Sequence, residues 1–311
     1  MGRELIAVVG PTCTGKGALA LALADALGGP AAVSIVACDS AKIYRGADVG
    51  TAKITGAARR GYEFFMVDVV EAGAPYSAGR YMSEGRAACE ALWRRGKLPL
   101  VVGGTGLYFR ALLDGICEAP PGDAAVRAAL RAREAAGEDL HKYLSEVDAE
   151  AAAHIAPADT KRIVRALEVF ELSGIPLTKI HKKGNRPLEA DEVVVALDGP
   201  RRWLRERIEL RTRRMLAAGL LAETRELLAQ VERPEAPPLN AIGYRQMVQL
   251  LRGELDEETA AAHVVGQTRR LAKRQRTWFK REARAKWLDA AKGTDALVDE
   301  AAKLLRTRLK K

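Results

Sequence analysis

Short apolar runs alternate with helix-forming stretches along the chain, and this alternation predicts its elements. Five apolar runs have the length of buried strands, and they lie at 5–9, 32–37, 64–70, 98–102 and 193–197. Helices are expected between them, first at 18–24 and later at 75–95, where alanine and leucine are frequent. Strands that alternate with helices in this way predict an α/β fold with a parallel sheet.

A long helical segment interrupts the strand pattern. It begins after an Ala-Pro-Pro-Gly-Asp sequence, and the residues that follow are rich in helix formers and poor in strand formers. The polar stretch 181–187 is predicted to lead back to the first domain. We therefore expect a core formed by 1–118 and 190–311, with a helical insertion at 119–189.

Composition limits the class of protein. The chain has 311 residues, of which 48% are hydrophobic and 29% charged, so one or two globular domains with a sizeable core are expected. No apolar run has the length of a membrane span, and the residues before the first glycine loop are too few for a secretory signal. The four cysteines have no paired spacing, which argues against disulfides or zinc. We expect a cytoplasmic protein that does not bind membranes.

Charge suggests a partner. Fifty Lys and Arg against forty Asp and Glu give a net charge of +10, which favours a polyanion. From Arg201 onward the chain is predicted to be almost wholly helical, and 266–286 carries nine basic residues and a single acid. Four of its side chains fall at helical spacing on one face, namely Arg270, Arg274, Trp278 and Arg281. A charge run is most often a solvated face, but the interleaved aromatics favour a nucleic-acid surface.

A glycine loop follows the first apolar run and precedes the first helical one. Seven of its eight positions fit G-x-x-x-x-G-K-[ST], and its residues are Gly10, Pro11, Thr12, Cys13, Thr14, Gly15, Lys16 and Gly17. In such a P-loop, backbone N–H groups and the helix N-terminus enclose an anion, and Lys16 adds a positive charge. Gly17 stands where a hydroxyl would bind magnesium. The sequence predicts a phosphate or diphosphate site, with a plain strand-to-helix turn as the alternative.

Two further positions lie where α/β sheets place ligand chemistry. Asp39 follows the second apolar run, and at the carboxyl end of a strand it could be a magnesium ligand, a general base or a helix cap. A second glycine turn, Gly-Gly-Thr-Gly, follows the fourth run and is expected to bring Thr105 beside the first loop. A plain turn is the alternative for this second loop.

These blocks together resemble the tRNA dimethylallyltransferase family. The blocks that carry the resemblance lie at 10–16, 39–40, 44–46, 48–53, 103–108, 162–168, 242–245, 273–275 and 277–279. They run in the family's order over most of the chain. Enzymes of this family transfer a dimethylallyl group from its diphosphate to N6 of the adenine just 3′ of the anticodon.

The resemblance implies roles for individual residues. The P-loop is implied to hold the diphosphate of dimethylallyl diphosphate, with Mg²⁺ as cofactor and the metal's protein ligands left open. Asp39 is implied to accept the proton of the adenine amine, Thr105 to hydrogen-bond nearby, and Arg211 to neutralise the leaving diphosphate. A monomer is expected. The implied tRNA contacts are Asp39, Ser40, Ala41, Lys42, Thr105, Arg127, Lys161, Arg162, Ile163, Val164, Arg165, Asn240, Ala241, Ile242, Gly243, Tyr244, Arg245, Lys273, Arg274, Gln275, Arg276, Thr277, Trp278, Phe279 and Lys280.

Three features depart from the family's pattern. Gly17 replaces a serine or threonine, Lys42 replaces a glutamine beside the target base, and 64–65 is a phenylalanine pair in place of two histidines. Two other functions therefore stay open. One is a non-catalytic tRNA-binding homologue. The other is an ATP-dependent P-loop kinase, which would explain Lys16 and Asp39 but not the basic stretch 266–286.

Overall fold

The computed structural model describes residues 2–182 and 184–308. Met1, Lys183 of the predicted return linker and 309–311 of the predicted core lie outside the described residues. The chain divides into two compact units, one formed by 1–113 with 188–311 and the other by 114–187. The backbone N–H of Leu188 donates to the carbonyl of Leu113 at 2.6 Å, so the outgoing and returning segments meet at one place in the first unit.

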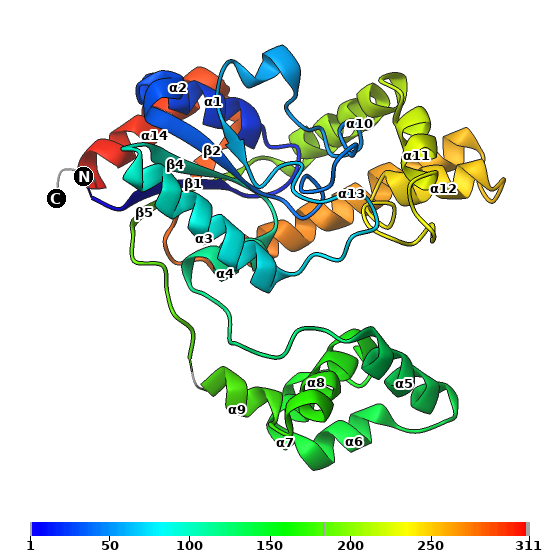
Figure 1. Ribbon diagram of the computed structural model, residues 1–311. Coiled ribbons are helices and arrows are strands. Elements are labelled where there is room, and N and C mark those ends of the chain that lie inside the picture. Colours follow the sequence, from blue (N-terminus) through cyan, green and yellow to red (C-terminus); the bar gives the residue numbers. More distant parts are fainter. Residues whose placement is uncertain (1, 183, 309–311) are drawn as a thin grey trace. The chain divides into compact units, whose positions relative to one another are not determined.

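The first unit is built on one parallel sheet of six strands in the order β3-β2-β4-β1-β5-β6 (Figure 1). The strands are β1 (Glu4–Val9), β2 (Val33–Cys38), β3 (Phe64–Phe65), β4 (Leu98–Gly103), β5 (Asp191–Asp198) and β6 (Ala285–Asp289). β1 is central, and its Ile6 lies opposite Leu100 of β4 on one side and Val193 of β5 on the other. Covered on both faces, β1 and β2 are almost continuous apolar runs, as buried parallel strands require. The predicted α/β fold is confirmed.

Helices cover both faces of this sheet (Figure 1). One core joins the sheet to α1 (Lys16–Ala26) and α14 (Thr294–Arg308) through side chains such as Leu19 and Leu297. The short helix α2 (Gly29–Ala32) follows α1. A second core joins the other face to α3 (Ala78–Arg94) and α4 (Gly106–Leu113) through Tyr81 and Phe109. Helix α3 begins where the Ser77 side chain accepts from a backbone N–H.

A helical layer lies beyond the carboxyl ends of the strands in Figure 1. It comprises α10 (Arg201–Ala217), α11 (Leu220–Leu228), α12 (Tyr244–Leu251) and α13 (Glu257–Phe279). A third core forms there, in which Met215, Leu220 and Met247 pack against Ile43 from the loop after β2. The single-turn 3₁₀ helices η1 (Gly56–Arg59) and η2 (Ala290–Lys292) complete this unit.

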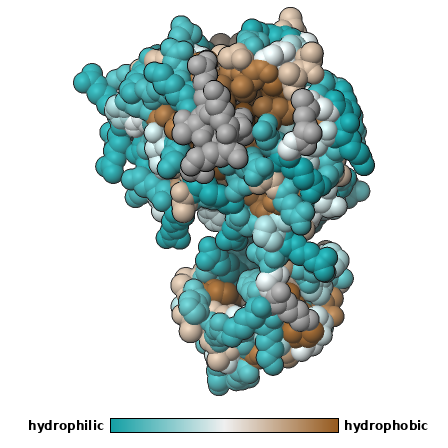
Figure 2. All heavy atoms as spheres, turned by 90° about the vertical axis from the view of Figure 1, so that its left-hand side faces the viewer, coloured by the Kyte–Doolittle hydropathy of each residue, from teal (hydrophilic) through white to brown (hydrophobic). Residues whose placement is uncertain are grey.

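The second unit is a small helical bundle with its own core. Its helices are α5 (Ala124–Ala135), α6 (Leu140–Val147), α7 (Ala149–His154), α8 (Thr160–Ser173) and α9 (Leu177–Lys182). An aspartate caps each of the first four by accepting backbone N–H groups, namely Asp123, Asp139, Asp148 and Asp159. Leu144 and Leu167 pack at its centre. Hydrophilic residues cover much of both units on the face shown in Figure 2.

Three details of local structure differ from the predictions. Beyond Arg201 the chain is largely helical, as predicted, but Ala285–Asp289 forms the edge strand β6, which pairs with β5 and was not predicted. The predicted strand 64–70 ends at Phe65, since Met66 and Asp68 have φ angles of 60° and 57°. Helix α13 ends at Phe279, so Arg281 lies beyond the helical face on which it was predicted.

In the described parts of the chain, no helix has the length and apolar character needed to span a membrane.

Candidate active site

The P-loop joins β1 to α1 and its shape depends on glycine. A Cβ on Gly10 would lie 2.3 Å from the carbonyl oxygen of Leu197, and Gly10 and Gly15 have φ angles of 126° and 88°. The Thr14 hydroxyl and the Lys16 ammonium both donate to the Pro11 carbonyl, at 2.9 and 2.6 Å. No side chain caps the start of α1 among the described residues, which leaves N–H groups of its first turn to meet an anion.

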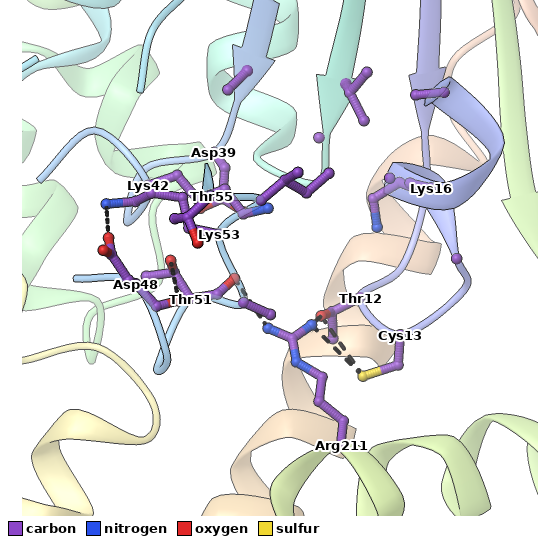
Figure 3. Close-up of a pocket in the computed structure, with 18 of the residues that line it drawn as sticks. Thr12, Cys13, Lys16, Asp39, Lys42, Asp48, Thr51, Lys53, Thr55 and Arg211 are labelled. Atoms are coloured by element: carbon purple, nitrogen blue, oxygen red, sulfur yellow. Dashed lines mark hydrogen bonds and ion pairs between the residues drawn. The ribbon is translucent and has the colours of Figure 1, made fainter. Parts of the chain in front are cut away.

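A cavity of about 590 Å³ opens beside this loop (Figure 3). The P-loop residues Thr12, Cys13, Gly15, Lys16 and Gly17 line it, whereas Gly10, Pro11 and Thr14 shape the loop. Its charged lining is Lys16, Asp39, Lys42, Asp48, Lys53, Arg207, Arg211 and Arg214. Its apolar lining includes Ala20, Leu21, Ile35, Ile54, Phe64, Val67 and Val102. A cavity with cations on one part and apolar side chains on another suits an amphipathic anion.

Burial shifts the pKa of two lysines that line the cavity, whereas Arg207 and Arg214 at its edge are exposed. The pKa of Lys16 is lowered to about 8, mainly by burial; Asp39 opposes this shift, and the positive charge of Arg211 contributes to it. Burial also lowers the pKa of Lys42, again against the influence of Asp39. An anion bound among these side chains would stabilise their charged forms, so the cavity favours a multiply charged ligand.

Helix α10 supplies two arginines to the P-loop. Arg211 donates to the Thr12 hydroxyl at 2.9 Å and to the Thr51 carbonyl at 3.3 Å, so its guanidinium spans from the P-loop to the turn that follows Ala47 (Figure 3). Arg207 donates from Nε to the Cys13 carbonyl at 2.9 Å. The structure therefore brings Arg211 to the predicted diphosphate site, although Arg211 lies far from that loop in sequence.

Asp39 and Thr105 meet because β2 and β4 are neighbours. Asp39 follows β2, and its Oδ1 accepts from the Ala41 N–H at 3.0 Å, which closes a turn rather than caps a helix. Thr105 follows β4, and its hydroxyl accepts from the Ser40 N–H at 3.1 Å. A Cβ on Gly103 would lie 1.9 Å from the Cys38 carbonyl oxygen, so only glycine permits this approach. Asp39 lines the cavity directly.

Gln275 of α13 joins the two glycine loops. Its Oε1 accepts from the Thr12 N–H at 2.8 Å, and its Nε2 donates to the Gly104 carbonyl at 2.9 Å. Sequence reasoning placed Gln275 on the tRNA surface and missed this bridge, because no local pattern reveals a contact between residues so distant in the chain. Together with the hydrogen bond from the Ser40 N–H to Thr105, these contacts link the turns after β1, β2 and β4 beside the cavity.

The predicted tRNA contacts differ in exposure. Side chains that are buried in the cores are Ile163, Val164, Tyr244 and Phe279. Arg127 and Arg165 pair at 2.8 and 2.6 Å with Glu168, whose side chain is fully buried. Arg276 pairs with Asp198 at 2.6 Å. The exposed members are Ser40, Lys161, Arg162, Asn240, Arg245, Lys273, Arg274, Thr277, Trp278 and Lys280.

This fold and cavity define an α/β protein of the P-loop type, with a cationic cavity beside the loop after its first strand. The IPP transferase family model matches residues 42–282, and the chain therefore belongs to this family. The chain is 43% identical to the tRNA dimethylallyltransferase of Salinispora arenicola, over 97% of this chain and 86% of the relative. It is 40% identical to that of Koribacter versatilis, over 97% and 98%. The resemblance seen in the sequence motifs is confirmed.

Solved structures agree with this assignment. The tRNA isopentenylpyrophosphate transferase from Bacillus halodurans aligns with a TM-score of 0.71 and 31% identity, covering 99% of this chain and 98% of that one. A eukaryotic dimethylallyltransferase acting on tRNA aligns with a TM-score of 0.77 and 25% identity, covering 92% of this chain and 74% of that one.

Proposed function

We propose that this chain transfers the dimethylallyl group of dimethylallyl diphosphate to N6 of the adenine 3′-adjacent to the anticodon of tRNA. The observation that carries the proposal is that Lys16, Arg211 and Asp39 all line one cavity. A leaving diphosphate needs cations, an attacking amine needs an acceptor for the proton that it loses, and this cavity offers both. Membership of the IPP transferase family supports the same reaction.

Different side chains bind the diphosphate, accept the proton and orient the proton acceptor. The P-loop amides, Lys16 and Arg211 bind the diphosphate and neutralise the charge that develops as the C1–O bond breaks. The amine nitrogen forms the new bond to C1, and Asp39 takes the proton that the nitrogen loses. Thr105, which holds the turn after Asp39 through the Ser40 N–H, orients this carboxylate. An exocyclic amine is a poor nucleophile, so the orientation of Asp39 matters.

The proposed Mg²⁺ is expected to enter with the diphosphate. Gly17 provides no hydroxyl, and a Cβ at this position would already lie 3.3 Å from Cδ1 of Ile54. Among the described residues, no group of three or more His, Cys, Asp or Glu side chains could hold a metal ion. Magnesium usually keeps several waters and binds substrate phosphates directly. The donor set here fits an ion held by diphosphate and water, with the protein contributing little.

tRNA is proposed to contact the exposed basic residues of both units. In the first unit these include Lys273 and Arg274 on α13 and Arg245 at the start of α12. In the second unit they include Lys161 and Arg162 at the start of α8. Single-stranded loops offer unstacked bases, and an anticodon loop can place its adenine in a cavity such as this one. We expect a monomer that works in the cytoplasm, where its tRNA substrate lies.

Mass analysis of a tRNA anticodon fragment tests this function. The chain is incubated with tRNA, dimethylallyl diphosphate and magnesium, and the fragment is expected to gain one prenyl group on the adenine next to the anticodon. Tight tRNA binding without modification would instead favour the non-catalytic homologue. ATP turnover on a small molecule would favour the kinase.

A further inference from the structure

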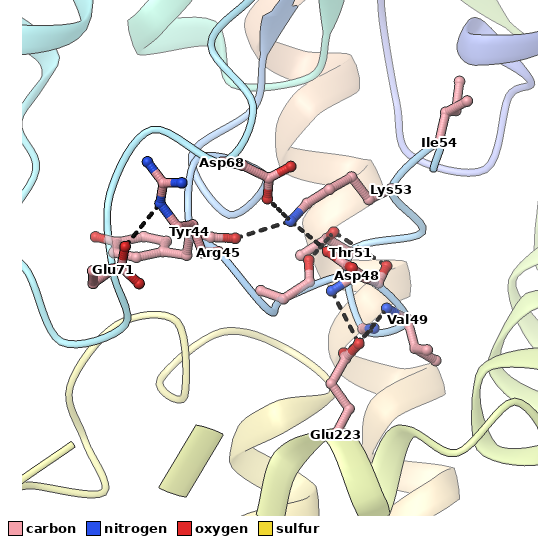
Figure 4. A network of polar contacts seen from close by, with 12 residues as sticks. Tyr44, Arg45, Asp48, Val49, Thr51, Lys53, Ile54, Asp68, Glu71 and Glu223 are labelled. Carbon is pink, nitrogen blue, oxygen red and sulfur yellow. Dashed lines mark hydrogen bonds and ion pairs between the residues drawn. The ribbon is translucent and has the colours of Figure 1, made fainter. Parts of the chain in front are cut away.

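The turn at residues 47–53 forms one wall of the cavity. Asp48, Val49 and Thr51 line it, and the Thr51 hydroxyl donates to the Ala47 carbonyl at 2.7 Å. The buried Lys53 ammonium pairs with Asp48 and with Asp68, both at 2.6 Å (Figure 4). Lys53 fixes the two ends of the turn, but these contacts do not satisfy the backbone N–H groups at its tip.

One carboxylate holds that tip from the helical layer. Glu223 of α11 accepts from the N–H groups of Asp48 and Val49 with one oxygen, at 3.0 and 2.7 Å. Its other oxygen accepts from the Gly50 N–H at 2.9 Å. Figure 4 shows Glu223 extending from the helix toward Asp48 and Val49. Three consecutive N–H groups that converge on one anion form a strong, charge-assisted contact.

Tyr244 completes the arrangement around Glu223. Its hydroxyl donates to the same oxygen as Gly50, at 2.6 Å, and the whole residue is buried. Burial and the neighbouring carboxylate raise the pKa of Tyr244, so the hydroxyl keeps its proton. A Cβ on Gly50 would lie 2.3 Å from Cζ of this ring, and only glycine fits. Two motif blocks, 48–53 and 242–245, therefore meet at Glu223, which belongs to neither.

The turn also anchors the arginine of the diphosphate site. The Arg211 guanidinium donates to two oxygens, the Thr12 hydroxyl in the P-loop at 2.9 Å and the Thr51 carbonyl at 3.3 Å. The first oxygen is fixed by the P-loop. The second is placed by the turn, whose tip Glu223 holds. A shift of the turn would leave Arg211 with one of these two anchors.

We propose that Glu223 is a positioning residue for diphosphate binding, because its carboxylate fixes the turn at 48–51 where the Thr51 carbonyl anchors Arg211. The inference rests on the proposed function only in assuming that Arg211 meets a diphosphate. Glu223 lines no part of the cavity and acts through Arg211 and the wall of the turn. Removing one anchor of a charged donor is expected to weaken diphosphate binding by about tenfold.

The test compares Glu223→Gln with Glu226→Gln, an equal charge change at an exposed position one turn along α11. Inorganic pyrophosphate is the probe, with its Kd measured by calorimetry. Glu223→Gln keeps the size of the side chain but turns an amide donor toward N–H groups, and it should raise the Kd about tenfold. Glu226→Gln should stay within about twofold of the wild type.

Hydrogen exchange and transfer kinetics separate positioning from general stability. Amides at 48–50 should exchange faster in Glu223→Gln, and the KM for dimethylallyl diphosphate should rise while the Kd for tRNA stays unchanged. Tyr244→Phe retains all three N–H contacts to Glu223, so its effects should be smaller in the same direction. If Glu223→Gln does not fold, Tyr244→Phe and Glu223→Asp carry the same measurements.

The result that overturns the proposal is a folded Glu223→Gln protein that binds pyrophosphate as the wild type does. A lower Tm with an unchanged Kd would mean a structural role alone, and it would also overturn the proposal. If the wild type bound no pyrophosphate, the proposed function would fail instead. Unchanged exchange at 48–50 in Glu223→Gln would then refute the positioning role on its own.

Discussion

Serine at position 17 tests how the P-loop works without a hydroxyl. Gly17 is the second residue of α1, next to Lys16, and it lines the cavity. A Cβ added there would lie 3.3 Å from Cδ1 of Ile54, closer than an ordinary van der Waals contact, so Ile54 must yield by a few tenths of an ångström. The substitution therefore combines a packing change with a new oxygen beside the diphosphate.

The expected change in stability is the sum of two opposing effects. Replacing a helical glycine stabilises by about 0.5–1 kcal/mol. Crowding of Ile54 opposes this by about 1 kcal/mol, the lower end of overpacking costs, because the contact involves the end of a side chain. Gly17→Ser alone should therefore leave the free energy of unfolding within about 1 kcal/mol of the wild type. A double-mutant cycle that combines Gly17→Ser with Ile54→Val should show a coupling free energy of about 0.5–1.5 kcal/mol between the two positions.

Two assays read these effects separately. Thermal unfolding measures the coupling between positions 17 and 54, and each kcal/mol should change Tm by about 2–4 °C. Magnesium titration of prenyl transfer measures the effect of the added hydroxyl, and Gly17→Ser should need less magnesium for the half-maximal rate. Gly17→Ala is the matched control, since it adds the same Cβ and no oxygen. If the effects of Gly17→Ser and Ile54→Val on the free energy of unfolding simply added, the packing argument would be refuted. If the wild type, Gly17→Ser and Gly17→Ala depended equally on magnesium, the hydroxyl would be irrelevant.

Three other predictions address the same site and the tRNA surface. Asp39→Ala should lower the rate of prenyl transfer by about 10²-fold or more with little change in tRNA affinity, and a wild-type rate in single-turnover assays would end its assignment as the base. Replacing Arg270, Lys273 and Arg274 with Gln should reduce the log–log salt slope of tRNA binding by about 0.7–0.9 for each phosphate that is no longer neutralised, while an unaltered slope would make this a solvated face. The pKa of Lys16, lowered to about 8, means that the free protein loses this proton above pH 8. Pyrophosphate affinity should therefore be full below pH 8 and fall above it, and calorimetry between pH 7 and 9.5 would contradict this if affinity stayed constant.

The P-loop could be predicted from sequence because its determinants are local. A strand, a turn that needs glycine at Gly10 and Gly15, and a helix follow one another directly, and each has its own pattern. The same holds for the strands β1, β2 and β4, which are buried on both faces and hence read as apolar runs. Arg211 was implied by family resemblance, and its geometry at the P-loop required the structure.

Elements and contacts that depend on distant partners could not be predicted in this way. Strand β6 lies at the sheet edge with Leu288 as its buried residue, so its pattern is mixed, and pairing with β5 decides its conformation. The chain bends at Asp68 after β3, where this carboxylate pairs with Lys53. Glu223 and Gln275 look like ordinary surface residues of helices. Their hydrogen bonds to loops far away in the chain give them their roles.

The hydrogen bond between Leu113 and Leu188 has a consequence for modular engineering. Because the two ends of the helical unit meet at this bond, a short turn can replace residues 114–187 without stretching the chain that remains. The sheet, the P-loop and α10 to α13 belong entirely to what is left. Such a shortened chain is expected to fold and to bind pyrophosphate. Its remaining affinity for tRNA would measure how much each unit contributes to tRNA binding. The excised helical unit could also be exchanged between homologues.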